Sequence, residues 1–149
     1  MNSRVLAVVL ALLAMPAAAQ TVVDGDTIKV DGTTYRIWGI DAAETKQACA
    51  DGWMAGQEAS KAMLELVTGR KITCEPRVTD RYGRTVALCR ADGVDLGASM
   101  VSAGMAWAFT RYSSDYVGQE RVAIGARLGV HKHDCEKPWD WRARSRGDR

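Results

Sequence analysis

Two groups of charged residues in the first part of the chain carry the side chains best suited to chemistry. The first group is Asp24-Gly25-Asp26-Thr27, Arg36 and Asp41-Ala42-Ala43-Glu44, and the second is Asp80-Arg81-Tyr82-Gly83-Arg84. Carboxylates suit a hard cation such as calcium, and guanidinium groups match the oxygens of a phosphate. Together, Asp26, Asp41 and Glu44 with two arginines could hold one divalent ion, one water and one phosphodiester. The set predicts metal-dependent cleavage of phosphodiester bonds.

Each of these residues also has a purely structural explanation. Asp24-Gly25 is typical of a turn, and Asp26 could belong to the same turn. Arg36 lies within an apolar, strand-like run, where a buried guanidinium needs an anionic partner, and a nearby aspartate would satisfy that need. Arg84 could be a solvent-exposed residue at a hairpin tip. The chemical interpretation therefore requires that both groups meet in one pocket.

The elements expected around these groups are short strands and helices. Asp31-Gly32 separates two strand-like runs, which is a strong signal for a two-residue β-hairpin. Strands are expected at residues 27–30, 33–40, 71–77 and 85–90, and helices at 56–68 and 96–103. Ser113-Ser114-Asp115 offers N-cap chemistry for a third helix, with Val117, Ile124 and Leu128 facing inward. This order favours an α+β fold containing a small OB-type Greek-key barrel, and another small α+β sandwich remains open.

Composition and the first twenty residues bear on domain number and location. The chain has 149 residues, 47% of them hydrophobic, which suits one compact domain. Arg4, the apolar run from Val5 to Leu13 and small residues up to Ala19 are typical of a secretory signal peptide. A membrane anchor is the alternative, but such a helix needs about 20 apolar residues. We expect a secreted or periplasmic protein that is a monomer, with no stable membrane association after cleavage.

Residues 1–19 are thus assigned to the signal peptide, 20–130 to the domain and 131–149 to a C-terminal extension. The formal net charge is only +2, so no broad polybasic surface is expected. The end of the extension, from Arg142 to Arg149, is locally basic. It could contact phosphates weakly, or it could be a frayed, solvated terminus.

Export would make the four cysteines candidates for disulfides. Cys74 and Cys89 lie in neighbouring strand-like runs, with Tyr82-Gly83 near the midpoint. A symmetric antiparallel hairpin would place the two opposite each other. Cys49 and Cys135 would then pair by elimination, although no local geometry supports that pairing. A zinc site is disfavoured, because no two cysteines lie close together in the sequence.

Three blocks of the sequence resemble the signature blocks of the staphylococcal-nuclease-like (thermonuclease) family. They are residues 23–27, 35–46 and 80–84, which occur in order and at fitting separations within a resemblance that spans about residues 22–130. The resemblance implies an OB-fold, a five-stranded Greek-key β-barrel with three helices. It also implies calcium-dependent endonuclease activity on DNA and RNA, a hydrolysis that leaves 3′-phosphate products.

The same resemblance implies roles for particular residues. Asp26, Asp41 and the carbonyl of Ala42 would be metal ligands, Glu44 the general base, Arg36 and Arg84 the phosphate-binding arginines, and Tyr82 a neighbour of the nucleotide's terminal phosphate. The sequence departs from the family pattern where Ala42-Ala43 replaces Thr-Pro, and residues 47–51 lack the lysines of the prototype. These departures bear on the rigidity of the loop and on substrate binding.

Aromatic residues could add to substrate binding. Tyr112 lies in a polar stretch near the expected cleft, where stacking on a base would contribute ~1–3 kcal/mol. Tyr116 is expected to pack against the third helix, and Trp107 and Phe109 to lie in the core.

Two other functions remain open. The chain could be a non-catalytic OB-type nucleic-acid-binding module. It could also be a structural exported domain whose acidic cluster binds calcium. A pure binding module would have no reason to gather Asp26, Asp41 and Glu44, because carboxylates repel phosphates.

Overall fold

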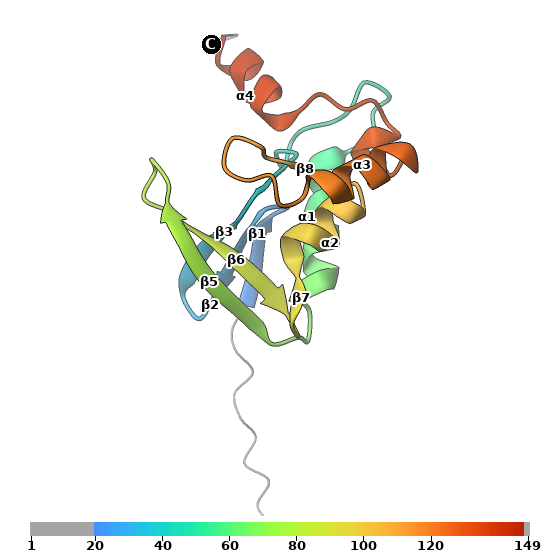
Figure 1. Cartoon of the computed structure of the whole chain (residues 1–149). Helices are drawn as coiled ribbons and strands as arrows, with labels where there is room; N and C mark the ends of the chain where they lie inside the picture. The colour runs from blue at the N-terminus through green and yellow to red at the C-terminus, as the bar shows by residue number, and fades with distance from the viewer. Residues whose placement is uncertain (1–19, 148–149) are drawn as a thin grey trace, which may run out of the picture.

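The computed structural model describes residues 20–147, so the expected signal peptide at residues 1–19 lies outside the described residues. The strands are β1 (Gln20–Asp24), β2 (Thr27–Val30), β3 (Thr33–Ile37), β4 (Ile40–Ala42), β5 (Ile72–Thr79), β6 (Thr85–Ala91), β7 (Val94–Asp95) and β8 (Ala106–Ala108). The helices are α1 (Ala55–Val67), α2 (Leu96–Ser102), α3 (Val117–Gly125), a short 3₁₀ helix (Gly129–His131) and α4 (Pro138–Gly147). In Figure 1 the long strands lie to one side of α1, α2 and α3, and α4 lies above them. Within residues 20–147 no helix is both long enough and apolar enough to cross a membrane.

The strands form two sheets. The larger has the order β1-β2-β3-β6-β5, with β7 also paired to β6, and the smaller consists of β4 and β8. β3 and β6 run parallel, whereas every other paired strand is antiparallel. The β2–β3 hairpin confirms the Asp31-Gly32 signal, since both residues have positive φ, 48° and 84°, as a type I′ turn requires. The α+β class is confirmed.

The expected strand at residues 33–40 is divided by a sharp turn. β3 ends at Ile37, and β4 begins at Ile40 in the other sheet. Gly39 has φ of 71°, and a Cβ at this position would lie 2.9 Å from the ring of Tyr116. Only glycine suits both the conformation and the space. This turn leaves Arg36 in the large sheet and places Asp41 in the small one, while the two side chains stay within hydrogen-bond distance.

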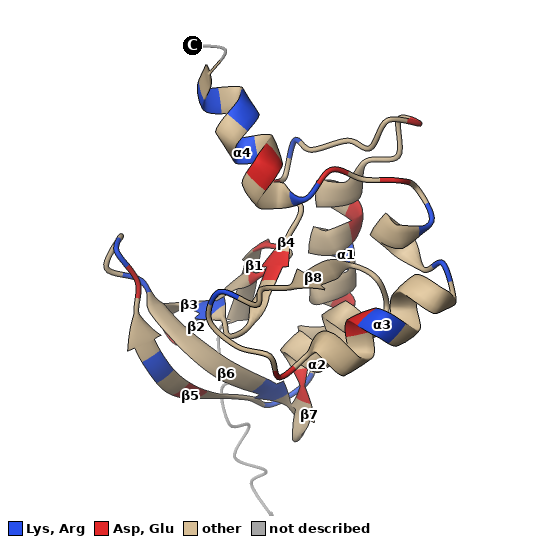
Figure 2. Cartoon of the chain, turned by 45° about the horizontal axis from the view of Figure 1, so that its top comes forward, with Lys and Arg blue, Asp and Glu red and all other residues tan. Residues whose placement is uncertain are grey.

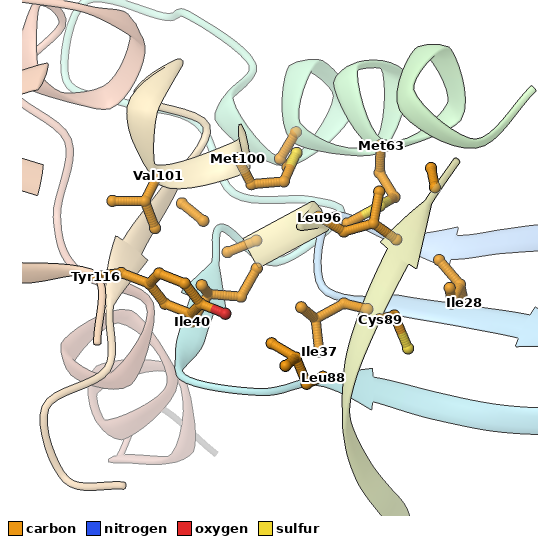
Figure 3. Packing of buried hydrophobic residues seen from close by; sticks show 14 of the residues in the cluster. Ile28, Ile37, Ile40, Met63, Leu88, Cys89, Leu96, Met100, Val101 and Tyr116 are labelled. Carbon is orange, nitrogen blue, oxygen red and sulfur yellow. The ribbon is translucent and has the colours of Figure 1, made fainter. Parts of the chain in front are cut away.

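The core lies between the large sheet and helices α1 and α2. Met63 on α1 and Met100 on α2 are fully buried, and Figure 3 shows them on the helical side of a cluster that includes Ile28 and Ile37 from the strands. Four of the five buried residues of α1 recur every four positions, which is the apolar face of an amphipathic helix: Ala55, Ala59, Met63 and Val67.

The expectation for the third helix is partly wrong. The N-cap of α3 is Tyr116, with no side-chain cap bond, and Ile124 and Leu128 are 53% and 40% exposed. The buried residue of α3 is Ala123. The Tyr116 hydroxyl donates to Asp95, the N-cap of α2, and Ile124 lies on the exposed side of α3.

Two features of the C-terminal part differ from the sequence expectation. α4 is a fourth α-helix beyond the three expected, so the chain is ordered as far as Gly147 and does not fray after Arg142. Both disulfides are present: Cys74–Cys89 and Cys49–Cys135. Cys74 and Cys89 are directly opposite in the β5–β6 ladder, as the hairpin symmetry predicted. The pairing by elimination is also confirmed.

Removal of the hairpin disulfide should lower the stability of the domain. The Cys74–Cys89 bridge spans 15 residues, and closing a loop of that length contributes about 3 kcal/mol in the chain-entropy model. We expect the double variant C74A/C89A to lose this amount in urea unfolding monitored by tryptophan fluorescence. Unchanged stability, or mass mapping that finds both thiols free in the native protein, would contradict the assignment.

Candidate active site

The strand register brings the two charged groups of the sequence to one edge of the large sheet. Thr27 of β2 is opposite Arg36 of β3, and Arg36 is opposite Val86 of β6. Asp26 immediately precedes β2, and Arg84 immediately precedes β6. Asp26, Arg36 and Arg84 therefore line one small hollow of about 60 Å³, together with Glu44. Four of the side chains that the chemical interpretation brings together thus meet in one pocket, whereas the fully buried Asp41 does not line it and contacts it through Arg36.

Arg36 connects the two aspartates. Its Nη2 donates to Asp41 Oδ1 over 2.8 Å, and its Nη1 lies 3.3 Å from Asp26 Oδ1. The Ala42 N–H donates to Asp26 Oδ2 over 2.8 Å, which ties the start of β2 to β4. Arg36 thus has the anionic partners that its buried position demands. Asp26, Arg36 and Asp41 form one ion-pair network.

Both aspartates are removed from water. Asp41 is fully buried and Asp26 is 4% exposed. Burial raises the pKa of each carboxyl, although Arg36 and, at Asp41, also Arg142 act in the opposite direction. The charged form of a buried carboxylate is stabilised by a nearby cation. This side of the hollow therefore favours positively charged ligands.

Glu44 is held in place through its main chain. A Cβ at Gly56 would lie 1.8 Å from the Glu44 carbonyl oxygen, so the start of α1 can approach this loop only because residue 56 is glycine. The buried Gln47 accepts from the Glu44 N–H and donates to the Glu136 carbonyl oxygen over 2.7 Å. Sequence reasoning missed Gln47, because the residue touches the cleft only through its neighbours. The Glu44 side chain itself is 37% exposed.

The tip of the β5–β6 hairpin positions Arg84. Asp80 Oδ1 accepts from the main-chain N–H groups of Tyr82 and Arg84 at 2.9 and 3.0 Å, and Gly83 has φ of 78°. Asp80 Oδ2 accepts from Arg84 Nε over 2.7 Å. These hydrogen bonds lower the pKa of Asp80 despite its burial. Within residues 20–147, the side-chain hydrogen bond of Arg84 uses Nε alone, and its guanidinium carbon lies 5.5 Å from the centroid of the Tyr82 ring, so its two Nη groups can still donate to a ligand.

A larger cleft of about 790 Å³ adjoins this hollow. Six arginines line it: Arg36, Arg81, Arg84, Arg111, Arg142 and Arg146. Four aromatic residues line it as well: Tyr82, Phe109, Tyr112 and Trp139. Figure 2 shows basic residues at the β5–β6 tip and along α4, with acidic residues near β1 and β4 below them. Guanidinium groups and aromatic rings are the contacts that bind the backbone and bases of single-stranded nucleic acid.

The aromatic residues are arranged partly as expected. Tyr82 and Tyr112 are 66% and 51% exposed at the cleft. Trp107 is buried, as is Tyr116 beside α3, in agreement with the sequence. The core assignment of Phe109 is wrong: its ring lies at the cleft, 5.3 Å from Tyr112 and 5.5 Å from Trp139 between ring centroids.

Arg142 is a cleft residue whose role the sequence did not predict. Its Nη2 donates to Asp41 Oδ2 over 2.6 Å, and its Nη1 donates to Glu44 Oε1 over 2.7 Å. The residue is 101 positions from Asp41 along the chain, and its only signal was the basic character of the tail. The extension therefore reaches the acidic side of the site.

The donor set is of a kind that suits a calcium ion. Among residues 20–147, no group of three or more His, Cys, Asp or Glu side chains is already arranged around a single metal position. Nevertheless, the small hollow is lined by Asp24, Asp26, Ala42 and Glu44, and the fully buried Asp41 lies next to Asp26 through Arg36. Carboxylate and carbonyl oxygens are the ligands that calcium prefers. The residues present therefore fit such an ion.

The fold and the cleft define a small α+β domain with an arginine-rich, acid-bordered site. The family model described as "Staphylococcal nuclease homologue" matches residues 34–130. An uncharacterized endonuclease of Escherichia coli O157:H7 is 34% identical over 131 residues, covering 83% of this chain and 82% of that protein. A micrococcal nuclease of Shigella flexneri is 30% identical, with coverage of 95% and 92%. The chain belongs to the staphylococcal nuclease family.

Longer relatives also match. A probable staphylococcal-like nuclease of Oryza sativa subsp. japonica is 31% identical over 121 residues, which is 79% of this chain but 35% of that protein. An uncharacterized 38.1 kDa protein of Capnoides sempervirens is 32% identical. The chain spans about a third of the length of these two plant relatives.

Proposed function

We propose that this chain is an exported, calcium-dependent endonuclease that hydrolyses phosphodiester bonds in DNA and RNA and leaves 3′-phosphate ends. The observation that carries the proposal is the meeting of Asp26, Arg36, Glu44 and Arg84 around one hollow. Relatives named as nucleases in E. coli and Shigella support it. A pure binding module would gain nothing from carboxylates at this position, because they repel phosphate.

The side chains have complementary tasks in this reaction. A water attacks phosphorus, its oxygen forms the new bond, and Glu44 accepts the proton that the water loses. The bond from phosphorus to the 5′ oxygen breaks, so the phosphate remains on the 3′ side, and the leaving oxygen takes a proton from solvent in the open cleft. Arg36 and Arg84 donate to the non-bridging oxygens and stabilise their growing negative charge.

Asp26, Asp41 and the carbonyl of Ala42 would hold the calcium ion. When bound, the ion would supply positive charge at the phosphate and lower the pKa of a bound water. Tyr82 and Tyr112, exposed at the cleft, would contact the substrate beside the cleaved bond, Tyr82 near a terminal phosphate and Tyr112 by stacking on a base.

The proposal includes the place and the form of the enzyme. Two disulfides are typical of proteins in oxidising compartments, which supports secretion or a periplasmic location. We assign the enzyme to a monomeric domain at residues 20–130, with residues 131–149 as an extension. The order β1-β2-β3-β6-β5 supports the five-stranded OB-type barrel that the family resemblance implies, in the partly open form of that fold.

Removal of the metal should abolish the activity. We expect purified mature protein to digest plasmid DNA and RNA with calcium, and a chelator such as EGTA to stop digestion until calcium is restored. End-group analysis should find phosphate at the 3′ ends and hydroxyl at the 5′ ends. Binding without cleavage under all metal conditions would favour the binding module, and calcium-dependent melting without cleavage would favour a structural calcium site.

A further inference from the structure

Helix α4 brings a third guanidinium to the acidic side of the cleft. Arg142 bridges Asp41 and Glu44 with hydrogen bonds of 2.6 and 2.7 Å, so it joins a proposed ligand of the ion to the proposed proton acceptor. A guanidinium keeps its positive charge at any working pH. Arg142 is therefore a permanent cation located where a divalent ion would bind.

The backbone of α4 does not depend on this ion pair for its position. The Cys49–Cys135 disulfide ties the segment before α4 to the loop preceding α1. Gln47 Nε2 donates to the Glu136 carbonyl oxygen, and the Trp139 ring packs against Phe109 with 5.5 Å between centroids. Figure 1 shows α4 above the β5–β6 tip and the strands that carry the acidic residues. The helix would therefore stay beside the cleft if the Arg142 side chain changed partners.

One partner of Arg142, Asp41, is a proposed calcium ligand, and the other, Glu44, is the proposed proton acceptor. An ion coordinated by Asp41 would compete with Arg142 for the same carboxylate oxygens, because both are attracted by the same negative charge. The released guanidinium would remain at the wall of the cleft that also contains Arg84 and Arg36. A phosphate bound there would be its nearest anion, and the planar fork of arginine matches phosphate oxygens.

We propose that Arg142 is a third phosphate-binding arginine, held on Asp41 and Glu44 in the empty protein and transferred to the nucleic-acid phosphate when calcium occupies Asp41. This inference rests on the function proposed above. It makes α4 part of the substrate site: Arg142 weakens calcium binding in the absence of substrate and strengthens substrate binding in the presence of calcium.

The test compares two arginines on the same helix by isothermal titration calorimetry. Calcium is titrated into the wild type, Arg142→Ala and Arg144→Ala, and a deoxynucleoside 3′,5′-bisphosphate, which has no diester bond to cleave, is then titrated at saturating calcium. Arg144→Ala is the matched control, because it removes the same charge from α4. In the wild type, Arg144 pairs with Glu136 over 2.8 Å and does not line the cleft.

Arg142→Ala should bind calcium about tenfold more tightly and the bisphosphate about tenfold more weakly, each equal to about 1.4 kcal/mol. Arg144→Ala should stay within twofold of the wild type, on the order of the weak effect of an exposed ion pair. Arg142→Lys keeps the charge but loses the bridging fork, so it should show both shifts at smaller size. It keeps the proposal testable if the alanine variant does not fold.

Equal affinities in Arg142→Ala and Arg144→Ala would overturn the proposal and leave Arg142 as an anchor for α4. Tighter calcium binding with unchanged bisphosphate binding would reject the phosphate role, and the reverse result would reject competition with the ion. A wild type that binds neither calcium nor the bisphosphate would instead contradict the proposed function itself, whatever the variants do.

Discussion

Replacement of Glu44 by glutamine should remove most of the cleavage activity and leave substrate binding nearly unchanged. A positioned general base typically contributes about 10²–10⁴-fold, and we expect kcat to fall by that order. The amide keeps the size of the side chain and an Oε1 acceptor for Arg142, so the fold should persist. The measurement is the initial rate of DNA cleavage at saturating calcium, with fluorescence anisotropy of a labelled oligonucleotide to follow binding.

Glu65→Gln is the matched control for this experiment. Glu65 is an exposed residue of α1 and does not line the cleft. Glu65→Gln removes the same charge as Glu44→Gln, and we expect it to leave kcat unchanged. If Glu44→Gln turned over as fast as Glu65→Gln, Glu44 would have no part in the reaction. If Glu44→Gln also failed to bind the oligonucleotide, the residue would serve binding and not proton transfer.

Truncation of Arg84 to alanine should lower kcat by about 10²–10³-fold, by comparison with the loss of other groups that stabilise transition-state charge. Its hydrogen bond to Asp80 uses only Nε, its guanidinium carbon lies 5.5 Å from the centroid of the exposed Tyr82 ring, and the residue lines the cleft. Asp80 would keep its two main-chain N–H donors, so the hairpin tip should retain its shape. Steady-state kinetics with a short DNA substrate would measure both kcat and KM.

Arg77→Ala provides the comparison, since Arg77 lies on the same hairpin, is exposed and is paired only loosely with Glu75 at 3.7 Å. It should leave both constants near those of the wild type. A rise in KM with unchanged kcat in Arg84→Ala would mean that Arg84 binds substrate and transition state equally, contrary to its proposed role.

The parts of the fold that short-range patterns control were predictable from the sequence. Asp31-Gly32 gave the β2–β3 turn, because few residue pairs tolerate positive φ at both positions. The symmetry of the 71–90 hairpin about Tyr82-Gly83 predicted that Cys74 lies opposite Cys89, as it does. Apolar spacing of three and four residues located α1 within one residue of its bounds.

The parts that depend on tertiary contacts were not predictable in this way. The division of residues 33–40 at Gly39 follows from the close approach of the Tyr116 ring, which is remote in sequence. Ile124 was expected on an apolar face, yet α3 buries Ala123 and leaves Ile124 53% exposed. Periodicity describes one helix and contains no information on its neighbours.

The central residues of the candidate site were predictable from the sequence, whereas two residues at its border were not. Asp26, Arg36 and Arg84 could be grouped from the sequence because they belong to the three blocks that resemble the family, and the strand register brings them to one hollow. Gln47 and Arg142 could not, because each acts through contacts that cross about ninety to a hundred residues of chain. Neither belongs to a short motif.

The most direct test of the account is a crystal structure of the mature protein with calcium and a deoxynucleoside 3′,5′-bisphosphate. The account predicts density for the ion against the carboxylates of Asp26 and Asp41, and a phosphate within hydrogen-bond distance of Arg36 and Arg84. An ion or a phosphate bound elsewhere on the molecule, with these carboxylates still paired only to arginines, would contradict it.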